Sequence, residues 1–396
     1  GDRMAVVLAE TEAAARAALP RIAVDYEDLP AVLTAQAALD RAEPATDERS
    51  YRNPLDEVVF VHGDPDAAFA RADHVAEVAV TTPRSHHCAV EPHVCLAWPE
   101  EDGRIAIHSP CQSVFAVQAV VAHALAMDPA RLHVTKAPIG GSFGGKAEPI
   151  LDPICAYLAE RTGRPVRLAL DRRETFTATR TRSPTSGRMR IALAADGRIL
   201  GRETDVVVDI GAYCTGGNYL PGSMLQRLAR LYAVPAERYR GRAMRDMGLD
   251  PVDARALNIV APGARDPWQR LDLGNARGAD CLKRGAEAFG WAARRAAATG
   301  KGRFRRGVGM AAATHINGCF PGDDEATTAT LRLRADGRAE LVCALHDLGC
   351  GSDTSLAQIA AEVLGLRAAE IAVVAADTDT CAYDLGTRAS RMTYIA

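Results

Sequence analysis

The residue types best suited to hold a large ligand lie at positions 139–146, in the sequence Ile-Gly-Gly-Ser-Phe-Gly-Gly-Lys. Glycines leave the backbone free of side chains, so amide N–H groups can approach an electron-rich ligand closely. A β-like run at 132–135 precedes this segment and a helix-like run at 150–158 follows it. The pattern therefore predicts a ligand-binding loop between a strand and a helix.

The same residues match most of a phosphate-binding P-loop, which needs Gly, four residues, Gly-Lys and then a hydroxyl that binds magnesium. The hydroxyl position is occupied by Ala147, so the magnesium ion would lack a ligand. A glycine-rich turn that serves only packing is a third interpretation. Both alternatives stay open on this motif alone.

Length and composition exclude several classes of protein. A chain of 396 residues can form two or three domains. Its formal net charge of −3 gives no electrostatic reason to expect nucleic acid or a membrane as partner. Ten cysteines without a Cys-x-x-Cys pair encode neither a zinc ribbon nor an iron–sulfur cluster. With no long apolar run and no signal peptide, we expect a cytoplasmic protein with free thiols.

Three Asp-Gly-Arg sequences lie between β-like runs, and each predicts a hairpin turn because Asp-Gly readily adopts positive φ. They occupy residues 102–104, 196–198 and 336–338. The first and the third are each followed by a polar loop, a helix and a strand. The predicted helices span 113–126 and 355–364, and the predicted strands lie near 133–134 and 371–374.

The apolar residues of both predicted helices indicate the faces that should be buried. Val117 and Val121 lie on one face of the first helix, and Ile359 and Val363 lie on one face of the second. The recurring order of elements predicts two related α+β units packed together, with a ligand cleft between them. Chance repetition of a common hairpin-helix unit is the alternative.

The glycine loop resembles the Gly-Gly-x-Phe-Gly-Gly-Lys loop of the molybdenum hydroxylases, the xanthine dehydrogenase and aldehyde oxidase family. Other segments resemble blocks of that family in the same order, namely residues 1–39, 86–93, 109–112, 208–213, 248–258, 349–354 and 384–393. The resemblance implies an α+β fold with mixed sheets. Residues 1–50 would be the remainder of a small α/β domain, and residues 51–245 and 246–396 would be two related molybdopterin-binding lobes.

The resemblance also implies that molybdenum is held by the dithiolene of a pterin and not by protein side chains. The cytosine dinucleotide is one form that this pterin could take. The residues implied in cofactor binding are Gln112, Gly141, Ser142, Phe143, Gly144, Gly145, Gly349, Cys350, Gly351, Thr387, Ser390 and Arg391. In this picture Phe143 and Gly144 face the metal, and the loop from Thr387 to Arg391 meets the phosphates.

Two of these assignments, and the residues that follow the second turn, have simpler explanations. Cys350 stands where the family usually has a glutamine that donates to a molybdenum oxygen, and a thiol is a shorter and weaker donor. Cys350 could instead be a small buried hydrophobic residue. Gln112 could cap a helix, and Asp353 and Thr354 could cap the helix that follows the turn.

A histidine-rich segment, residues 86–93, also contains metal-binding residue types. At strand spacing His87, Glu91 and His93 would share a face. Three ligands along one strand would lie too far apart to surround one ion. We therefore expect this segment to form a pocket wall.

Two departures from the family concern activity. The segment that ends near residue 242 continues directly into the segment that begins near residue 247, whereas the family carries several tens of residues between them. The family's glutamate base is expected beyond Ala396. This chain then supplies no catalytic residue and should be inactive alone. A non-catalytic scaffold that binds partner proteins is therefore an alternative function.

The resemblance implies a parent oxidoreductase that hydroxylates an aldehyde, an N-heterocycle or an aromatic substrate with oxygen from water. Electrons would pass to 2Fe-2S and FAD partner subunits in a hetero-oligomer. Ala147 stands where purine-oxidising members carry a glutamate, which makes a purine substrate less favoured.

Overall fold

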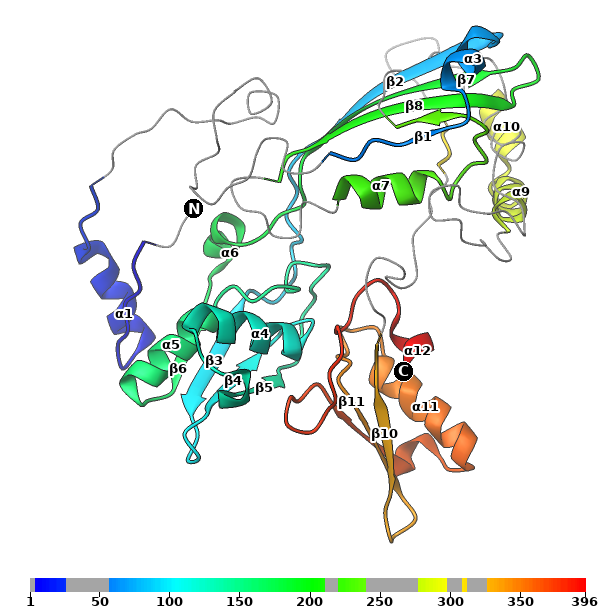
Figure 1. Cartoon of the computed structure of the whole chain (residues 1–396). Helices are drawn as coiled ribbons and strands as arrows, with labels where there is room; N and C mark the ends of the chain where they lie inside the picture. Colours follow the sequence, from blue (N-terminus) through cyan, green and yellow to red (C-terminus); the bar gives the residue numbers. More distant parts are fainter. Residues whose placement is uncertain (1–3, 26–56, 211–219, 240–276, 298–307, 312–325) are drawn as a thin grey trace. The chain divides into compact units, whose positions relative to one another are not determined.

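A computed structural model describes residues 4–25, 57–210, 220–239, 277–297, 308–311 and 326–396 (Figure 1). These residues form two compact units. The first contains Gly1–Tyr26, His86–Arg182 and Ile316–Ala396, and the second contains Glu27–Ser85 and Ser183–His315. The segment 248–258 and the joined ends near 242–247 lie outside the described residues. Only the beginning of the segment 208–213 is described.

The first sheet of the first unit has the strand order β5-β4-β3-β6. Its strands are β3 (Val94–Pro99), β4 (Ile105–Ser109), β5 (Leu132–Lys136) and β6 (Val166–Ala169). Strand β3 pairs antiparallel with β4 and with β6, whereas β4 and β5 are parallel. The helices α4 (Val114–Leu125) and α5 (Asp152–Thr162) contribute to the same hydrophobic core as these strands.

The local sequence explains where these elements begin and end. Gly103 adopts a φ of 83° in the predicted turn between β3 and β4. Ser113 caps α4 by accepting a hydrogen bond from the amide of Ala116 at 3.2 Å. Val117 and Val121 are buried on the inner face of α4, as the sequence pattern predicted.

The second sheet of the first unit repeats this order of elements. It consists of β10 (Ala329–Leu333), β11 (Ala339–Cys343) and β12 (Ile371–Ala375). Strands β10 and β11 form an antiparallel hairpin, and β12 lies parallel to β11. The helix α11 (Ser352–Leu364) connects β11 to β12, just as α4 connects β4 to β5. A short 3-10 turn precedes the parallel strand in both cases: η2 (Pro129–Arg131) and η4 (Ala368–Glu370).

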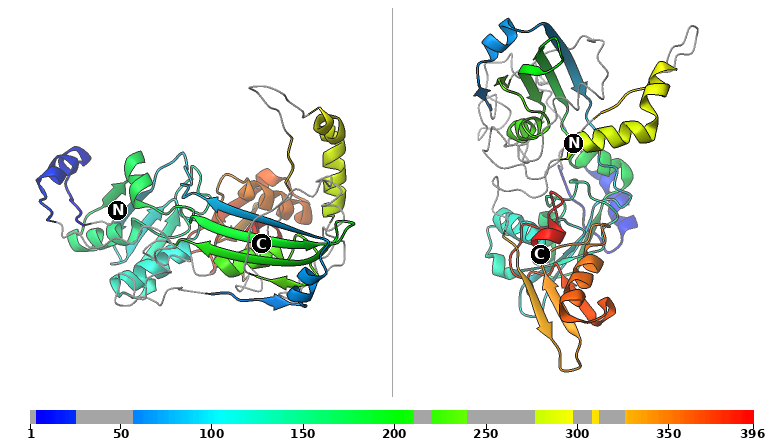
Figure 2. Two further views of the ribbon diagram at one scale, coloured as in Figure 1. Left: turned by 90° about the horizontal axis from the view of Figure 1, so that it is seen from above. Right: turned by 90° about the vertical axis from the view of Figure 1, so that its right-hand side faces the viewer.

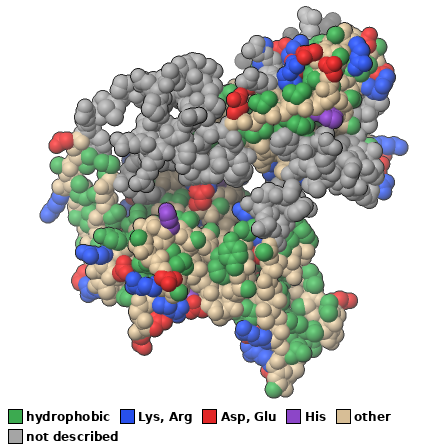
Figure 3. All heavy atoms as spheres, viewed as in Figure 1, with side chains coloured by type: hydrophobic (Ala, Val, Ile, Leu, Met, Phe, Trp, Pro, Cys, Tyr) green, Lys and Arg blue, Asp and Glu red, His purple; other side chains and the backbone are tan. Residues whose placement is uncertain are grey.

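The buried face of α11 differs from the predicted one. Leu356, Ala357 and Ala361 face the core, whereas Ile359 and Val363 are exposed, Val363 by 81%. The prediction was wrong because it assigned the buried face from the two large branched residues. The small alanines on another face of the helix pack against the sheet instead. Hydrophobic side chains are accordingly visible on the surface of this unit (Figure 3).

The segment that follows β12 runs along β5 and joins the two sheets. Thr135 and Asp377 form an isolated antiparallel bridge. The amide of Lys136 donates to the carbonyl of Ala376, and the amide of Thr378 donates to the carbonyl of Val134, both at 3.1 Å. Ala376 belongs to the core of the first sheet. The loops that leave β5 and β12 are therefore held at one edge.

Around these sheets lie shorter elements of the first unit. They are α1 (Glu12–Ala18), η1 (Leu19–Arg21), α6 (Arg172–Ala178) and α12 (Met392–Ile395). Of the predicted small leading domain, residues 1–50, only residues 4–25 are described. They contain α1 and η1 and no strand.

The second unit is built on a sheet with the order β1-β9-β8-β7-β2 (Figure 2). The strands are β1 (Val61–His62), β2 (His74–Thr82), β7 (Thr185–Leu193), β8 (Ile199–Val208) and β9 (Glu237–Arg238). Its helices are α3 (Pro65–Ala70), α7 (Leu220–Leu228), α9 (Gly278–Phe289) and α10 (Trp291–Ala296). The predicted Asp-Gly turn at 196–197 joins β7 to β8. Among the residues that the structure describes, no helix is long and apolar enough to span a membrane.

Two neighbouring valines of α4 offer a matched test of this core. Val121 is fully buried, whereas Val120 is 43% exposed. We expect Val121→Ala to lower the free energy of unfolding by about 2 kcal/mol, because two buried methyl groups are lost and a cavity remains. The same change at Val120 should stay within about 0.5 kcal/mol. Urea unfolding measures both, and equal effects would contradict the assigned core face.

Candidate functional site

The glycine segment after β5 forms a loop, as its sequence predicted. Gly141, Phe143 and Gly144 all adopt positive φ, of 97°, 55° and 92°. Positive φ is unusual for a phenylalanine and indicates that surrounding contacts hold the loop in shape. Phe143 is 63% exposed, whereas Ser142 beside it is buried. The loop therefore presents Phe143 outward and anchors itself through Ser142.

The segment 86–93 lies against this loop. The Glu91 carboxylate accepts a hydrogen bond from the Gly140 amide at 2.8 Å and forms an ion pair with Lys146. His93 Nε2 lies 3.0 Å from the carbonyl oxygen of Gly145. Burial is the main cause that lowers the pKa of His87 to about 4, so this imidazole is neutral. The segment is a loop and not a strand, and its Glu91 and His93 side chains contact the glycine loop instead of sharing a metal-binding face.

Two of the glycines are required by packing within the chain. A Cβ atom on Gly140 would lie 2.5 Å from the Cβ of Glu91, and one on Gly145 would lie 3.0 Å from His87 Nδ1. A Cβ on Gly144 would meet nothing nearer than 3.8 Å. Only Gly144 therefore leaves open space beside the loop, although its φ also disfavours a side chain.

Lys146 does not behave as a P-loop lysine. Its side chain is only 3% exposed, and its ammonium group is paired with Glu91. A P-loop lysine must reach the phosphates of a bound nucleotide. The inward ion pair argues against that alternative.

Gln112 links the glycine loop to a second loop, residues 384–391. Its carboxamide donates to the carbonyl of Thr387 at 2.9 Å and accepts from the hydroxyl of Ser142. Its backbone carbonyl accepts from the amide of Thr387 at 2.9 Å, and its amide donates to the carbonyl of Lys146 at 3.0 Å. Ser113, and not Gln112, caps the helix α4. The residue is buried and acts as a bridge.

The loop 384–391 is buried at both ends. Gly386 packs against Gln112 and Ser113 where any Cβ would collide with their atoms. The Thr387 hydroxyl donates to the carbonyl of His346 at 2.7 Å and accepts from its amide at 2.9 Å. This hydroxyl is therefore used by the protein itself, and the loop is not an ordinary surface turn.

Arg391 is the largest fully buried side chain of the described residues. Its Nη2 donates to Asp384 Oδ1 at 2.7 Å. Its Nε and Nη1, and Asp384 Oδ2, have no hydrogen-bond partner among the described residues. A buried N–H without an acceptor costs about 1–3 kcal/mol, and more when it is charged. Beside it Ala389 and Ser390 adopt positive φ of 51°, and Ser390 is exposed. These features fit a site for an anionic group.

The turn at 349–351 is organised by a residue that the sequence analysis missed. The Asp347 carboxylate accepts from the amides of Gly349, Gly351 and Asp353 at 2.7, 3.2 and 3.4 Å. Burial raises the pKa of Asp347, but these amide donors outweigh it, so the pKa lies below its usual value. An aspartate two residues before a glycine is a known turn signal and could have been recognised.

Two of the simpler alternatives for this turn are wrong. Cys350 is exposed, with its Sγ 3.9 Å from Asp347 Oδ1, so it is not a small buried hydrophobic residue. Asp353 and Thr354 lie within the first turn of α11 and do not cap it, because the helix begins at Ser352. Asp353 instead forms an ion pair with Lys136 at 3.1 Å.

Family models match most of the chain. The description molybdopterin cofactor-binding domain applies to two matches, over residues 49–258 and 284–396. The chain therefore belongs to the family of molybdopterin cofactor-binding proteins and, within it, to the molybdenum-binding chains of the xanthine dehydrogenase and aldehyde oxidoreductase type.

Individual relatives agree with this assignment. The xanthine dehydrogenase molybdenum-binding subunit of Escherichia coli O157:H7 is 30% identical over all of this chain and 57% of its own length. The aldehyde oxidoreductase of Megalodesulfovibrio gigas is 29% identical over 92% of this chain and 43% of its own. The solved aldehyde oxidoreductase of Desulfovibrio desulfuricans has a TM-score of 0.84 at 25% identity, over 97% of this chain and 46% of its own. The chain thus spans about half the length of these relatives.

Removal of the Gln112 side chain tests its bridging role. Gln112→Ala leaves the Ser142 hydroxyl and the Thr387 carbonyl buried without their partner, which should cost about 1–3 kcal/mol of unfolding free energy. Gln358→Ala, an exposed glutamine of α11, is the control and should cost less than about 0.5 kcal/mol. Similar midpoints in urea for the two variants would show that Gln112 is not a structural bridge.

Asp347 should contribute a pH-dependent part of the stability. Because its pKa is lowered in the folded state, the contribution is complete above the unfolded pKa of about 3.9 and is lost as the pH falls through the folded value. We expect the difference in melting temperature between the wild type and Asp347→Asn to be largest near neutral pH and to shrink in acid. A difference that is constant from pH 7 to pH 3 would contradict this.

Proposed function

We propose that this chain forms the molybdopterin-binding part of an oxidoreductase that hydroxylates a carbonyl or heteroaromatic carbon with oxygen from water. The observation that carries the proposal is the buried Arg391, whose Nε and Nη1 lack acceptors among the described residues. This arginine lies in a loop that Gln112 ties to the glycine loop. A phosphate of the pterin's tail would supply the missing acceptors.

The remaining site residues divide into two groups. Gly144, the exposed Phe143, Ser390 and the turn from Gly349 to Gly351 are free to contact the cofactor. Gln112, Ser142 and Thr387 use their polar side-chain atoms within the protein. Gly141 adopts the positive φ that the loop requires, and Gly145 packs against His87. Residues of the second group therefore position the loops and do not bind the cofactor directly through their side chains.

When bound, the cofactor would supply two-electron redox chemistry at molybdenum. The chain would contribute a rigid wall and amide donors, and it would exclude water from part of the site. Cys350, exposed beside the organised turn, would give a weaker contact than the glutamine usual in the family. Glu91 is unsuited to the role of a general base, because its Oε2 is paired with Lys146 and accepts from the Gly140 amide, and both contacts favour the charged carboxylate over its protonated form. We propose a glutamate of the parent protein for that role.

Substrates and partners remain part of the proposal. Named relatives include a xanthine dehydrogenase subunit and an aldehyde oxidoreductase. Ala147 argues for an aldehyde, an N-heterocycle or an aromatic substrate in preference to a purine. Partner subunits with FAD and 2Fe-2S clusters would accept the electrons in a cytoplasmic hetero-oligomer. The P-loop alternative is disfavoured by the buried Lys146.

A conservative change at Arg391 tests the proposed anion site. Arg391→Lys keeps the positive charge near Asp384 but removes the guanidinium fork. We expect the affinity for pterin to fall about tenfold or more, which corresponds to a loss of at least about 1.4 kcal/mol of binding free energy. The matched control is Arg367→Lys, an exposed arginine paired with Glu370. The chain is purified from a host that makes molybdopterin, and molybdenum and oxidised-pterin fluorescence are measured.

Circular dichroism shows whether both variants are folded. Wild-type chain without pterin would argue for the non-catalytic scaffold. Unchanged pterin content in a folded Arg391→Lys variant would remove Arg391 from the site. Turnover is assayed on the same samples with a panel of aldehydes and N-heterocycles.

A further inference from the structure

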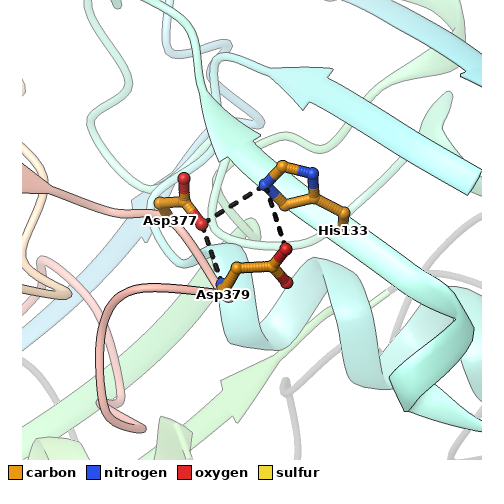
Figure 4. A group of neighbouring side chains, drawn as sticks. All are labelled: His133, Asp377 and Asp379. Carbon is orange, nitrogen blue, oxygen red and sulfur yellow. Dashed lines mark hydrogen bonds and ion pairs between the residues drawn. The ribbon is translucent and has the colours of Figure 1, made fainter. Parts of the chain in front are cut away.

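A second cluster of potential ligands lies where the two sheets of the first unit meet (Figure 4). His133 belongs to β5, and Asp377 and Asp379 belong to the segment that follows β12. They come together because Thr135 and Asp377 form a β-bridge. In addition, the Val134 amide donates to the Thr378 hydroxyl, and the Thr378 amide donates to the Val134 carbonyl. Nothing in the proposed cofactor site uses these side chains.

The three side chains direct their ligand atoms to one point. His133 Nε2 lies 3.3 Å from Asp377 Oδ1 and 3.8 Å from Asp379 Oδ2. One ligand atom from each residue lies within 4.8 Å of the other two. The backbone amide of Asp379 donates to Asp377 Oδ1 at 2.8 Å, which fixes that carboxylate. With these separations between the ligand atoms, a small inward movement of the three side chains would let them bind a single ion.

The outer contact of His133 decides which of its nitrogens is available. Its Nδ1 lies 2.9 Å from Glu100 Oε1 and is the nitrogen that donates to this carboxylate. In the neutral imidazole Nε2 then carries a lone pair. A histidine whose second nitrogen is oriented by a carboxylate is a common arrangement at metal sites.

The local charges favour a cation. Nε2 is buried and makes no hydrogen bond among the described residues. It faces two carboxylate oxygens, and acceptors that face each other need a cation or a proton between them. Three carboxylates, those of Glu100, Asp377 and Asp379, lie around the His133 imidazole. The Arg104 guanidinium, which contacts Asp379 at 2.8 Å, neutralises only part of this charge.

We propose that His133, Asp377 and Asp379 bind one divalent transition-metal ion, with Zn²⁺ the best match, and that Glu100 positions His133. An imidazole nitrogen with carboxylate oxygens suits Zn²⁺ better than Mg²⁺ or Ca²⁺, which prefer oxygen ligands alone. The ion joins β5, which leads into the glycine loop, to the segment that leads into the loop 384–391. It acts as a clip between the two cofactor-binding loops.

The test uses the purified full chain after treatment with a chelator and removal of that chelator. Titration with Zn²⁺ in a calorimeter should reveal one site that Mg²⁺ does not fill. Co²⁺ serves as a spectroscopic substitute, and its bound spectrum should lack a thiolate charge-transfer band. Such a band would instead assign the metal to exposed thiols such as Cys88 and Cys350, and would overturn the proposal.

Variants separate the ligands from their surroundings. His133→Ala and Asp379→Asn should each abolish the site, and Glu100→Gln should weaken it about 10–100-fold, because a neutral amide oxygen replaces the carboxylate that accepts from Nδ1. The controls are His123→Ala, an exposed histidine of α4, and Asp336→Asn in the β10–β11 turn. Both controls should bind Zn²⁺ as the wild type does. Zn²⁺ binding that survives in a folded His133→Ala variant would refute the proposal.

The clip itself has a separate measurement. The amides of Lys136 and Thr378 bond across the junction of the two sheets. Zn²⁺ at ten times its dissociation constant should slow their hydrogen exchange about tenfold in the wild type and not in Asp379→Asn. Unchanged exchange in the metal-bound wild type would refute the clip. Because these experiments need no pterin, they are independent of the proposed function.

Discussion

The arrangement of the candidate site depends on the buried carboxamide of Gln112. A glutamine side chain can donate and accept at once, and this one accepts from the glycine loop while it donates to the loop 384–391. Its backbone carbonyl is bound to Thr387 as well. Two loops that are far apart in sequence therefore share one set of hydrogen bonds, and neither can shift without leaving buried polar groups unpaired.

The charged side chains with little exposure differ in how completely they are paired. Lys146 and Glu91 neutralise each other beneath the glycine loop, and Arg202 pairs with Glu237 in the second unit. Arg391 differs, since Asp384 satisfies only one of its guanidinium nitrogens. Among the described residues these two pairs are closed, whereas the fully buried Arg391 in the loop 384–391 keeps two guanidinium donors unpaired. That difference, more than the shape of the loops, points to a phosphate-bearing ligand.

The two sheets of the first unit are built in the same way, yet their helices bury different residues. In α4 branched valines fill the interface, and in α11 alanines and one leucine do so. The two repeats therefore share the order of elements and the parallel strand pair. They differ in the side chains that fill the interface between helix and sheet. Each helix leads its sheet back to the shared edge between β5 and the segment after β12, where both sets of loops begin.

The local elements could be predicted from the sequence: the Asp-Gly turns, the hairpins, the glycine loop and the helix α4 with its apolar face. These follow from short-range preferences for φ and from periodicity, which neighbouring residues encode. Four further features became known from the three-dimensional structure: Gln112 bridges two loops, Asp347 holds the 349–351 turn, Cys350 is exposed, and His133 lies beside Asp377 and Asp379. Hydrogen-bond partners distant in the chain, and the burial of each side chain, depend on packing between elements, which no local pattern specifies.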